Sequence, residues 1–298
     1  IISSSGGFTA SGAIGNTTPL TSLSATAGGN ISYVNNITTT GSISLNAEGN
    51  VDPNPSSGNI TLTTTNSDVT LNADSEGNGT GTFYGNLIIN PGSGNVTIRG
   101  ATIANESYQV NGTGTLTIES NAASFASNFT SSALTEASTL TEVTIGKSTN
   151  TSNINLNSAI AIAGPITVYG GSIDVNSNLT ATGGNILLDA DTGSALATND
   201  DGVLIAGGVT VQTSTSGNIT IYGRSGNNNT ADLVGIQTTG SGNSISITSA
   251  GDITMIGISE AANSSTARGT YFHTTDITAA GNINITGQAK NESNDYDV

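Results

Sequence analysis

The stretch Gly217-Asn218-Ile219-Thr220-Ile221 decides the fold class, because variants of it recur along almost the whole chain. Each copy has a glycine, then Asn, Ser or Asp, and then an apolar, a polar and an apolar residue. Gly and Asn tolerate positive φ and suit turns, whereas the alternating residues after them suit a strand with one buried face. Further copies begin at Gly41, Gly58, Gly94, Gly171, Gly251 and Gly281.

The distances between copies predict how these strands are arranged. Ile60 and Leu87 are 27 residues apart, as are Val69 and Val96, so a pair of strands is repeated as a unit. Later, three strand starts recur together, as Val203, Val209 and Ile219, then Ile236, Ile245 and Ile253, then Tyr271, Ile277 and Ile283. Periods of this length with a constant strand phrase are typical of a solenoid whose turns vary in length. We therefore expect an all-β protein, a parallel β-helix of roughly ten to fourteen coils.

Two other interpretations of the pattern are weaker. A β-sandwich also has short alternating strands, but two-residue hairpin turns do not recur regularly in this chain. Disorder is the ordinary meaning of a composition rich in Gly, Ser and Asn, but Ile, Val and Leu recur in phase with the strand phrase, which a disordered chain does not require. No shift in composition divides the chain, so we expect residues 1–298 to form a single β-solenoid segment of a longer fibre.

The charge of the chain excludes several classes of partner. The formal net charge is −16, and the cations are only five in number. They are Arg99, Lys147, Arg224, Arg268 and Lys290. Nucleic acid is not an expected partner, because phosphate binding requires clustered Lys and Arg. No run of about 18 apolar residues is present, so we expect no membrane span. The absence of cysteine fits a protein that folds outside the cell without disulfides.

One segment, residues 119–142, lacks glycine and breaks the pattern. We expect an irregular coil there, in which Phe125 and Phe129 fill a wider section of the interior. A short helix or an excursion along the flank of the solenoid is the alternative, since the two rings are four residues apart.

Several stretches resemble the repeats of very long bacterial surface proteins of the filamentous-haemagglutinin kind. These stretches are Leu140 to Lys147, Asn153 to Ile160, Gly164 to Ile173 and Gly202 to Ile205, continuing through Gly217 to Gly223. The resemblance covers about two thirds of the chain. It implies a right-handed parallel β-helix that is secreted and displayed at the bacterial cell surface, where it serves adhesion, aggregation or projection. The secretion domain of that family is not recognisable in this sequence.

The candidates for chemistry are few. The single histidine, His273, lies beside Tyr271 and Phe272 and is interpreted as a packing or surface residue rather than a general base. Parallel β-helices also include polysaccharide hydrolases and lyases that use carboxylates, and the best carboxylate group here is Asp189, Asp191, Asp200 and Asp201, with Asp174 nearby. Asp is equally an ordinary turn residue. We therefore predict no catalytic residue and no cofactor, with those four aspartates as weak candidates for one calcium ion.

Asn-x-Ser/Thr sequons recur within the strand phrase itself, where turn chemistry explains the asparagine. Some relatives in the resembled family are glycosylated at sequons. The candidate acceptors in expected loops are Asn78, Asn105, Asn111 and Asn263.

Taken together, the sequence predicts a structural and adhesive protein rather than an enzyme. Its expected partners are adjacent repeats of the same fibre, a cell-surface or glycan receptor, and other copies associating end to end through open strand edges. The alternative is a polysaccharide hydrolase or lyase on the same fold. A binding face of Thr ladders is disfavoured, because Thr-x-Thr pairs such as Thr61 and Thr63 do not recur in register.

Overall fold

The structure is a computed structural model that describes residues 1–54, 58–132, 134–191, 198–227, 233–240, 244–261, 267–290 and 296–297. The described residues are strands, turns and bends, with no helix. None of them forms an apolar helix that could cross a bilayer. The chain divides into two compact units, unit 1 being Ile1–Gly146 and unit 2 being Lys147–Val298.

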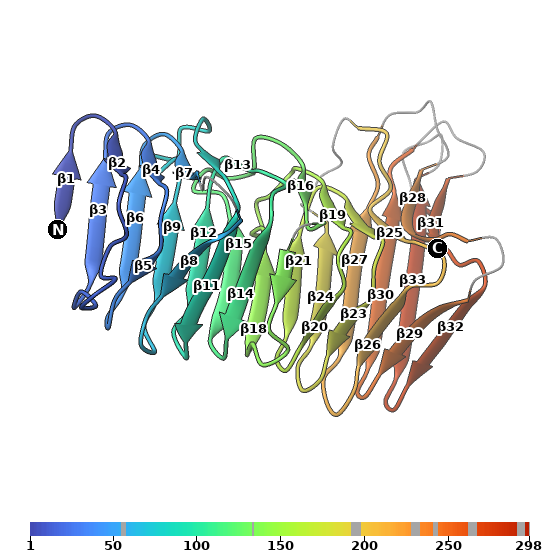
Figure 1. The fold of residues 1–298 in the computed structure, drawn as a ribbon. Helices are drawn as coiled ribbons and strands as arrows, with labels where there is room; N and C mark the ends of the chain where they lie inside the picture. The colour runs from blue at the N-terminus through green and yellow to red at the C-terminus, as the bar shows by residue number, and fades with distance from the viewer. Residues whose placement is uncertain are drawn as a thin grey trace. The chain divides into compact units, whose positions relative to one another are not determined.

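Unit 1 is built from coils that visit three parallel sheets in turn (Figure 1). Sheet 1 contains β1 (Ile2–Ser4), β3 (Leu23–Ala27), β6 (Ile43–Ala47), β9 (Val69–Asn72), β12 (Val96–Arg99), β15 (Thr115–Glu119) and β18 (Glu142–Ile145). Sheet 2 contains β2 (Phe8–Ala10), β4 (Ile31–Tyr33), β7 (Val51–Pro53), β10 (Thr82–Phe83) and β13 (Thr102–Ile103). Sheet 3 contains β5 (Ile37–Thr38), β8 (Ile60–Thr63), β11 (Leu87–Gly92), β14 (Tyr108–Gly112) and β17 (Leu134–Glu136).

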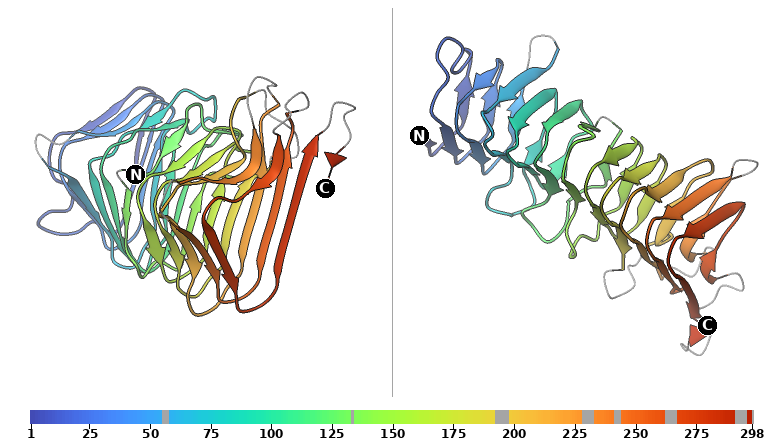
Figure 2. Two further views of the ribbon diagram at one scale, coloured as in Figure 1. Left: turned by 90° about the vertical axis from the view of Figure 1, so that its right-hand side faces the viewer. Right: turned by 90° about the horizontal axis from the view of Figure 1, so that it is seen from below.

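Unit 2 repeats this three-sheet plan with longer strands (Figure 2). Sheet 4 contains β21 (Ile166–Tyr169), β24 (Ile186–Ala190), β27 (Ile219–Arg224), β30 (Ile253–Ser259), β33 (Ile283–Lys290) and the antiparallel β34 (Tyr296–Asp297). Sheet 5 contains β19 (Ile154–Leu156), β22 (Ile173–Val175), β25 (Val203–Ile205), β28 (Val234–Thr238) and β31 (Arg268–Tyr271). Sheet 6 contains β20 (Ile160–Ile162), β23 (Leu179–Ala181), β26 (Thr210–Thr213), β29 (Ile245–Ser249) and β32 (Thr275–Ala279).

The predicted all-β parallel β-helix is confirmed in both units. Sheet 1 has seven parallel strands and sheet 4 has five, so twelve coils are seen in the described residues, within the expected range. The spacings read from the sequence are strand pairs in register: Leu87 pairs with Ile60, and Val96 pairs with Val69. The interior is formed by columns such as Ile219, Ile253 and Ile283, whose first two members are fully buried.

Asparagine in the strand phrase has a different role from the one expected. It does not adopt positive φ in the described copies. Instead its side-chain oxygen accepts a hydrogen bond from the backbone of the next coil: the N–H of Asn218 donates to Asn185 Oδ1, and the N–H of Asp252 donates to Asn218 Oδ1, both at 2.8 Å. The series ends with the N–H of Asn282 donating to Asp252 Oδ1 at 2.7 Å. The phrase therefore joins coils as well as turning the chain.

The glycine of the phrase is required mainly by this close stacking. A Cβ at Gly281 would lie 2.1 Å from Asp252 Oδ1, and one at Gly251 would lie 2.2 Å from Asn218 Oδ1. Positive φ is needed only at some copies, such as Gly58 and Gly217.

A second set of close contacts joins sheets 4 and 5. A Cβ at Gly257 of β30 would lie 2.0 Å from the carbonyl oxygen of Gly269 of β31, and a Cβ at Gly223 would lie 2.1 Å from that of Gly235. The backbones of the two sheets thus approach each other at a corner where no side chain fits.

Residues 119–142 form a coil of turns with two short strands, β16 (Phe129–Thr130) and β17. Phe125 and Phe129 are buried, and their rings stack with centroids 6.0 Å apart. The described part of this segment contains no helix.

Two expected alignments were wrong. Ile277 was aligned with Ile245, but the register pairs Ile245 with Thr275 and Ile247 with Ile277, a shift of two residues that keeps the side chains on the same face. Tyr271 was aligned with Ile236, but the register pairs Ile236 with Thr270 and Tyr271 with Gln237. A shift of one residue moves a side chain to the other face of a strand, so Tyr271 lies on the outer face of sheet 5. Its side chain is 36% exposed.

Candidate ligand-binding site

The four calcium candidates fall into two groups. Asp189 faces outward on β24, in register between Tyr169 of β21 and Tyr222 of β27. Its Oδ1 accepts a hydrogen bond from the N–H of Asp191 at 3.0 Å. Burial raises the pKa of the Asp189 carboxyl, and the Asp191 charge adds to this rise while the hydrogen bond opposes it.

Asp191 is neutralised by an arginine of the next coil. Arg224 Nε donates to Asp191 Oδ1 at 2.6 Å, and its Nη1 donates to Glu260 Oε1. Glu260 is only 5% exposed, and Lys290 Nζ lies 3.5 Å from its Oε2. Acidic and basic side chains therefore alternate over four successive coils of sheet 4. This arrangement satisfies Asp191 with a cation that the protein itself supplies.

Asp200 and Asp201 lie instead with Asp174. Asp201 Oδ1 accepts a hydrogen bond from the N–H of Val234 at the start of β28, at 2.8 Å. The pKa of Asp201 is raised to about 6, mainly by burial; the hydrogen bond from Val234 opposes this rise, and the charges of Asp174 and Asp200 add to it. Burial and the charge of Asp200 also raise the pKa of Asp174.

The structure thus separates the two ends of the predicted acidic loop. Asp189 and Asp191 belong with Arg224 on sheet 4, whereas Asp200 and Asp201 belong with Asp174 of β22. Among the described residues, no group of three or more His, Cys, Asp or Glu side chains has the arrangement of a metal site.

The sequon asparagines differ in how their side chains are used. Asn78 is exposed, and its Oδ1 accepts hydrogen bonds from the N–H of Thr80 at 3.1 Å and from the Thr80 hydroxyl at 2.6 Å. The buried Asp74 holds this loop by accepting the N–H groups of Asn78 and Gly79. Asn78 therefore presents its amide to solvent in a local turn made by its own sequon.

The other three candidate acceptors differ from Asn78 in their surroundings. Asn111 is half-buried, and its Nδ2 donates to Asn90 Oδ1 of the preceding coil at 3.0 Å, so its amide is already engaged. Asn105 is exposed in a turn. Asn263 lies outside the described residues.

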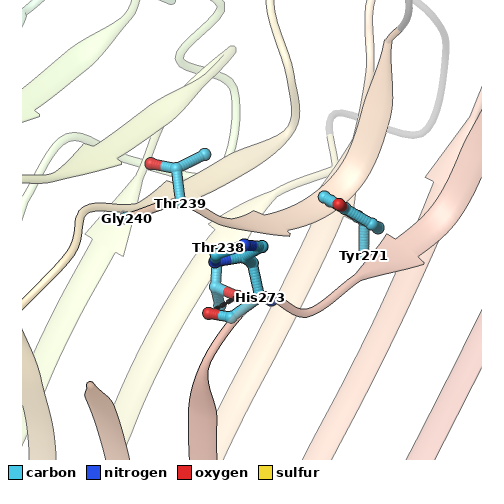
Figure 3. A pocket seen from close by; sticks show the side chains of 5 residues that line it. All are labelled: Thr238, Thr239, Gly240, Tyr271 and His273. Atoms are coloured by element: carbon cyan, nitrogen blue, oxygen red, sulfur yellow. Dashed lines mark hydrogen bonds between the residues drawn. The ribbon is translucent and has the colours of Figure 1, made fainter. Parts of the chain in front are cut away.

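A pocket of about 210 Å³ lies in unit 2, where β28 and β31 end. It is lined by Thr238, Thr239, Gly240, Tyr271 and His273, and Figure 3 shows the Tyr271 side chain directed across it toward Thr238 and His273. Thr238 fixes the wall: its Oγ1 accepts the N–H of His273 at 2.8 Å and lies 2.7 Å from Thr275 Oγ1.

Two groups at or beside this pocket are the imidazole of His273 and the guanidinium of Arg268. The exposed His273 has its Nδ1 3.1 Å from Thr274 Oγ1, and within the described part of the chain no hydrogen bond engages its Nε2. Thr274 has a positive φ of 49°, which sets the turn carrying the imidazole. The guanidinium of Arg268 lies over the Tyr271 ring at 4.8 Å from its centroid. The pocket thus has an aromatic ring and an imidazole in its lining, with a cation stacked on that ring.

From the sequence, His273 is interpreted as a packing or surface residue beside Tyr271, and Arg268 is not among the candidate site residues. The sequence contains one local signal for this group of residues. The only histidine and one of five Lys or Arg residues occur within six positions of each other in a chain that is otherwise poor in basic residues.

Comparisons with known proteins identify no relative. No family model matches the chain, and neither a curated protein nor a solved structure matches it.

Proposed function

We propose that this chain is a structural and adhesive segment of a secreted β-helical fibre at a bacterial cell surface. The observation that carries the proposal is the registered stacking of coils in each unit. Backbone hydrogen bonds, apolar columns and the Asn and Asp side chains of the turns all join a coil to the next.

This stacking suits a mechanical role. When a coil is pulled away from its neighbour, the hydrogen bonds of three parallel sheets must break together, and buried Ile and Val columns must be exposed to water. Outward-facing positions do not have to fit a buried column. In sheet 1 a single column of hydroxyl residues runs along the outer face, made of Ser24, Ser44, Thr70, Thr97, Thr117 and Thr144.

The resemblance to filamentous-haemagglutinin-like repeats supports secretion, surface display and a place among adjacent repeats. The edge of sheet 4 supports association with a further coil. Ile283 and Ile285 of β33 are 45% and 40% exposed, although they continue columns in which Ile253 and Met255 are fully buried. Among the described residues, β34 pairs with Ala289 and Lys290 at this edge. Another coil, from adjacent repeats or from a second copy, would bury the rest.

Adhesion is tested directly by coating beads with the chain and measuring their attachment to cultured cells and to immobilised glycans, with albumin-coated beads as the control. Attachment above the control is the expected result. Light scattering over a concentration series tests association, and Ile283→Asp together with Ile285→Asp should reduce it. Attachment no greater than that of albumin would contradict the adhesive role.

A polysaccharide hydrolase or lyase is the second candidate, and one observation favours it. Asp201, with its pKa raised to about 6, lies in the field of Asp174 and Asp200, and glycoside hydrolysis requires a protonated and an ionised carboxyl together. Incubation with acidic and neutral polysaccharides, with and without calcium, measures this activity as released reducing ends or unsaturated products. Turnover that is lost in Asp201→Asn would support the enzyme over the fibre.

A further inference from the structure

Arg268 differs from the other basic residues in its surroundings. Arg99 pairs with Glu119 at 2.7 Å, and Arg224 and Lys290 both contact Glu260. Lys147 also has an interaction partner. Arg268 is exposed, and in the described part of the chain it contacts the Tyr271 ring without an ion pair to a carboxylate. A cation with no carboxylate partner among the described residues is unexpected for a purely structural residue in a chain of net charge −16.

Around this cation the structure gathers groups with complementary properties. Tyr271 is 36% exposed at the pocket. Its ring is larger than the side chains of the other residues that line the pocket. His273 presents an imidazole from the same turn, and Thr239 and Gly240 supply a hydroxyl and backbone polar groups on the opposite side. Thr238, whose hydroxyl binds the N–H of His273, keeps the turn in place without a ligand.

We propose that this pocket binds one acidic sugar residue, a saccharide ring bearing a carboxylate, at the end or along the side of a glycan. The guanidinium of Arg268 pairs with the carboxylate, and His273 Nε2 donates or accepts a hydrogen bond with a ring substituent. The Tyr271 ring packs against the apolar C–H face of the sugar. This proposal rests on the adhesive role and names the receptor class for it.

The size and charge of the site favour a single sugar over a longer polyanion. The pocket of about 210 Å³ is below the roughly 300–1,000 Å³ of sites for drug-sized ligands. The acidic chain would repel a ligand carrying many negative charges, since long-range repulsion slows encounter and weakens binding. A small site with one ion pair is expected to bind with a Kd on the order of 1 mM. Strong adhesion would then come from many copies along a fibre.

The test uses methyl β-glucuronide as the acidic probe, methyl β-glucoside as its neutral counterpart and acetate as a probe of charge alone. Binding to the complete chain is measured by ligand-observed NMR titration. The glucuronide should bind at least about tenfold more tightly than the glucoside or acetate, since an ion pair and a stacking contact are then both made. Equal binding of all three probes, or no binding of the glucuronide at concentrations of tens of millimolar, would overturn the proposal.

Two variants locate the site. Arg268→Gln should weaken glucuronide binding about tenfold with little effect on the glucoside, and Tyr271→Ala should weaken both sugars. Lys290→Gln is the control for net charge, because it removes the same charge from the same unit at an ion pair with Glu260 and does not line the pocket, so it should leave binding unchanged. If Lys290→Gln has the same effect as Arg268→Gln, net charge rather than the pocket explains the binding. Thermal unfolding confirms that each variant is folded.

The bead assay separates this proposal from the adhesive role. Loss of bead attachment in Arg268→Gln supports the pocket as the receptor site. Attachment that persists in this variant, with no glucuronide binding by the wild type, refutes the pocket and leaves the adhesive role standing. Absence of attachment by the wild type refutes the adhesive role, whereas the NMR titration still decides whether the pocket binds the sugar.

Discussion

Units 1 and 2 share one plan of three parallel sheets but place their aromatic residues differently. In unit 1, Tyr33, Phe83, Tyr108, Phe125 and Phe129 are buried in the interior. Among the described residues of unit 2, the buried apolar side chains are aliphatic, and Tyr169, Tyr222 and Tyr271 lie on outer faces. Most rings of unit 1 therefore fill its interior, whereas these three rings of unit 2 lie outside it.

The two units also differ in charge. Arg99 is the only Lys or Arg of unit 1, and the other four cations and the single histidine occur in unit 2. A solenoid interior restricts inward positions to shapes that stack, but outward positions are free to vary. If the proposed sugar site is real, unit 2 is the unit suited to recognition, because it carries these outer rings and most of the cations.

The comparison is tested most strongly by removing one ring from each unit. Phe83→Ala should destabilise the protein by about 3–5 kcal/mol, because it leaves a cavity where a fully buried ring packs against Tyr108. Tyr222→Ala removes a half-exposed ring and should cost less than about 1 kcal/mol. Denaturant unfolding followed by circular dichroism measures both. Similar losses at the two sites would show that the outer rings of unit 2 are structural.

The corner between sheets 4 and 5 of unit 2 should be the next most sensitive feature. Gly257→Ala places a methyl group against the Gly269 carbonyl and should destabilise unit 2 by roughly 1–3 kcal/mol or more, since the backbone rather than a side chain must move. Gly12→Ala is the control, because no atom lies within 4 Å of the added Cβ. If Gly257→Ala unfolds like wild type, the two sheets are not in close contact at this corner.

One substitution in the interior of unit 1 is expected to stabilise the protein, by a smaller amount. The hydroxyl groups of Tyr33 and Tyr108 are buried with no hydrogen-bond partner among the described residues, and burial raises the pKa of both well above the ordinary tyrosine value. Tyr108→Phe removes an unsatisfied polar group from the interior and should stabilise the protein by about 1 kcal/mol. Tyr222→Phe, on the outer face, should change stability little. Destabilisation by Tyr108→Phe would mean that its hydroxyl has a bound partner such as water.

The last expected effect is a dependence of stability on pH in unit 2. The pKa of Asp201 is about 6 in the folded protein and about 3.8 in the unfolded chain, so protons bind the folded state more tightly. Its stabilising contribution is complete below the unfolded pKa and is lost as pH rises through about 6. The Tm should therefore fall between about pH 4 and pH 8, and Asp201→Asn should reduce that fall. An unchanged pH profile in Asp201→Asn would assign the dependence to other carboxyls.

The fold could be predicted because a parallel solenoid repeats one local pattern. Ile60 and Leu87, or Ile154 and Ile173, pair at the spacings visible in the sequence, because each strand must lie above the equivalent strand of the preceding coil. The turn residues could be located in the sequence, but only part of their role could be predicted. Their Asn side chains bond to the next coil, and a contact of that kind depends on stacking that the local sequence does not display.

The sites were less predictable, because they depend on register and on which loops meet. A one-residue shift placed Tyr271 outside rather than beneath Ile236, and no sequence spacing distinguished the two registers. The acidic loop looked like one group in sequence, yet Asp191 pairs with Arg224 and Asp201 faces Val234.

The sequence by itself thus determined the strands, the coils and the inward residues, since these follow from alternation and period within one chain segment after another. Tertiary structure alone decided which side chains converge. Tyr271 and His273 line a pocket with Thr238 and Thr239, with Arg268 beside Tyr271, only because β28 and β31 are neighbours in one sheet and their turns stack. A pocket forms between coils, so its shape depends on distances that no single coil encodes.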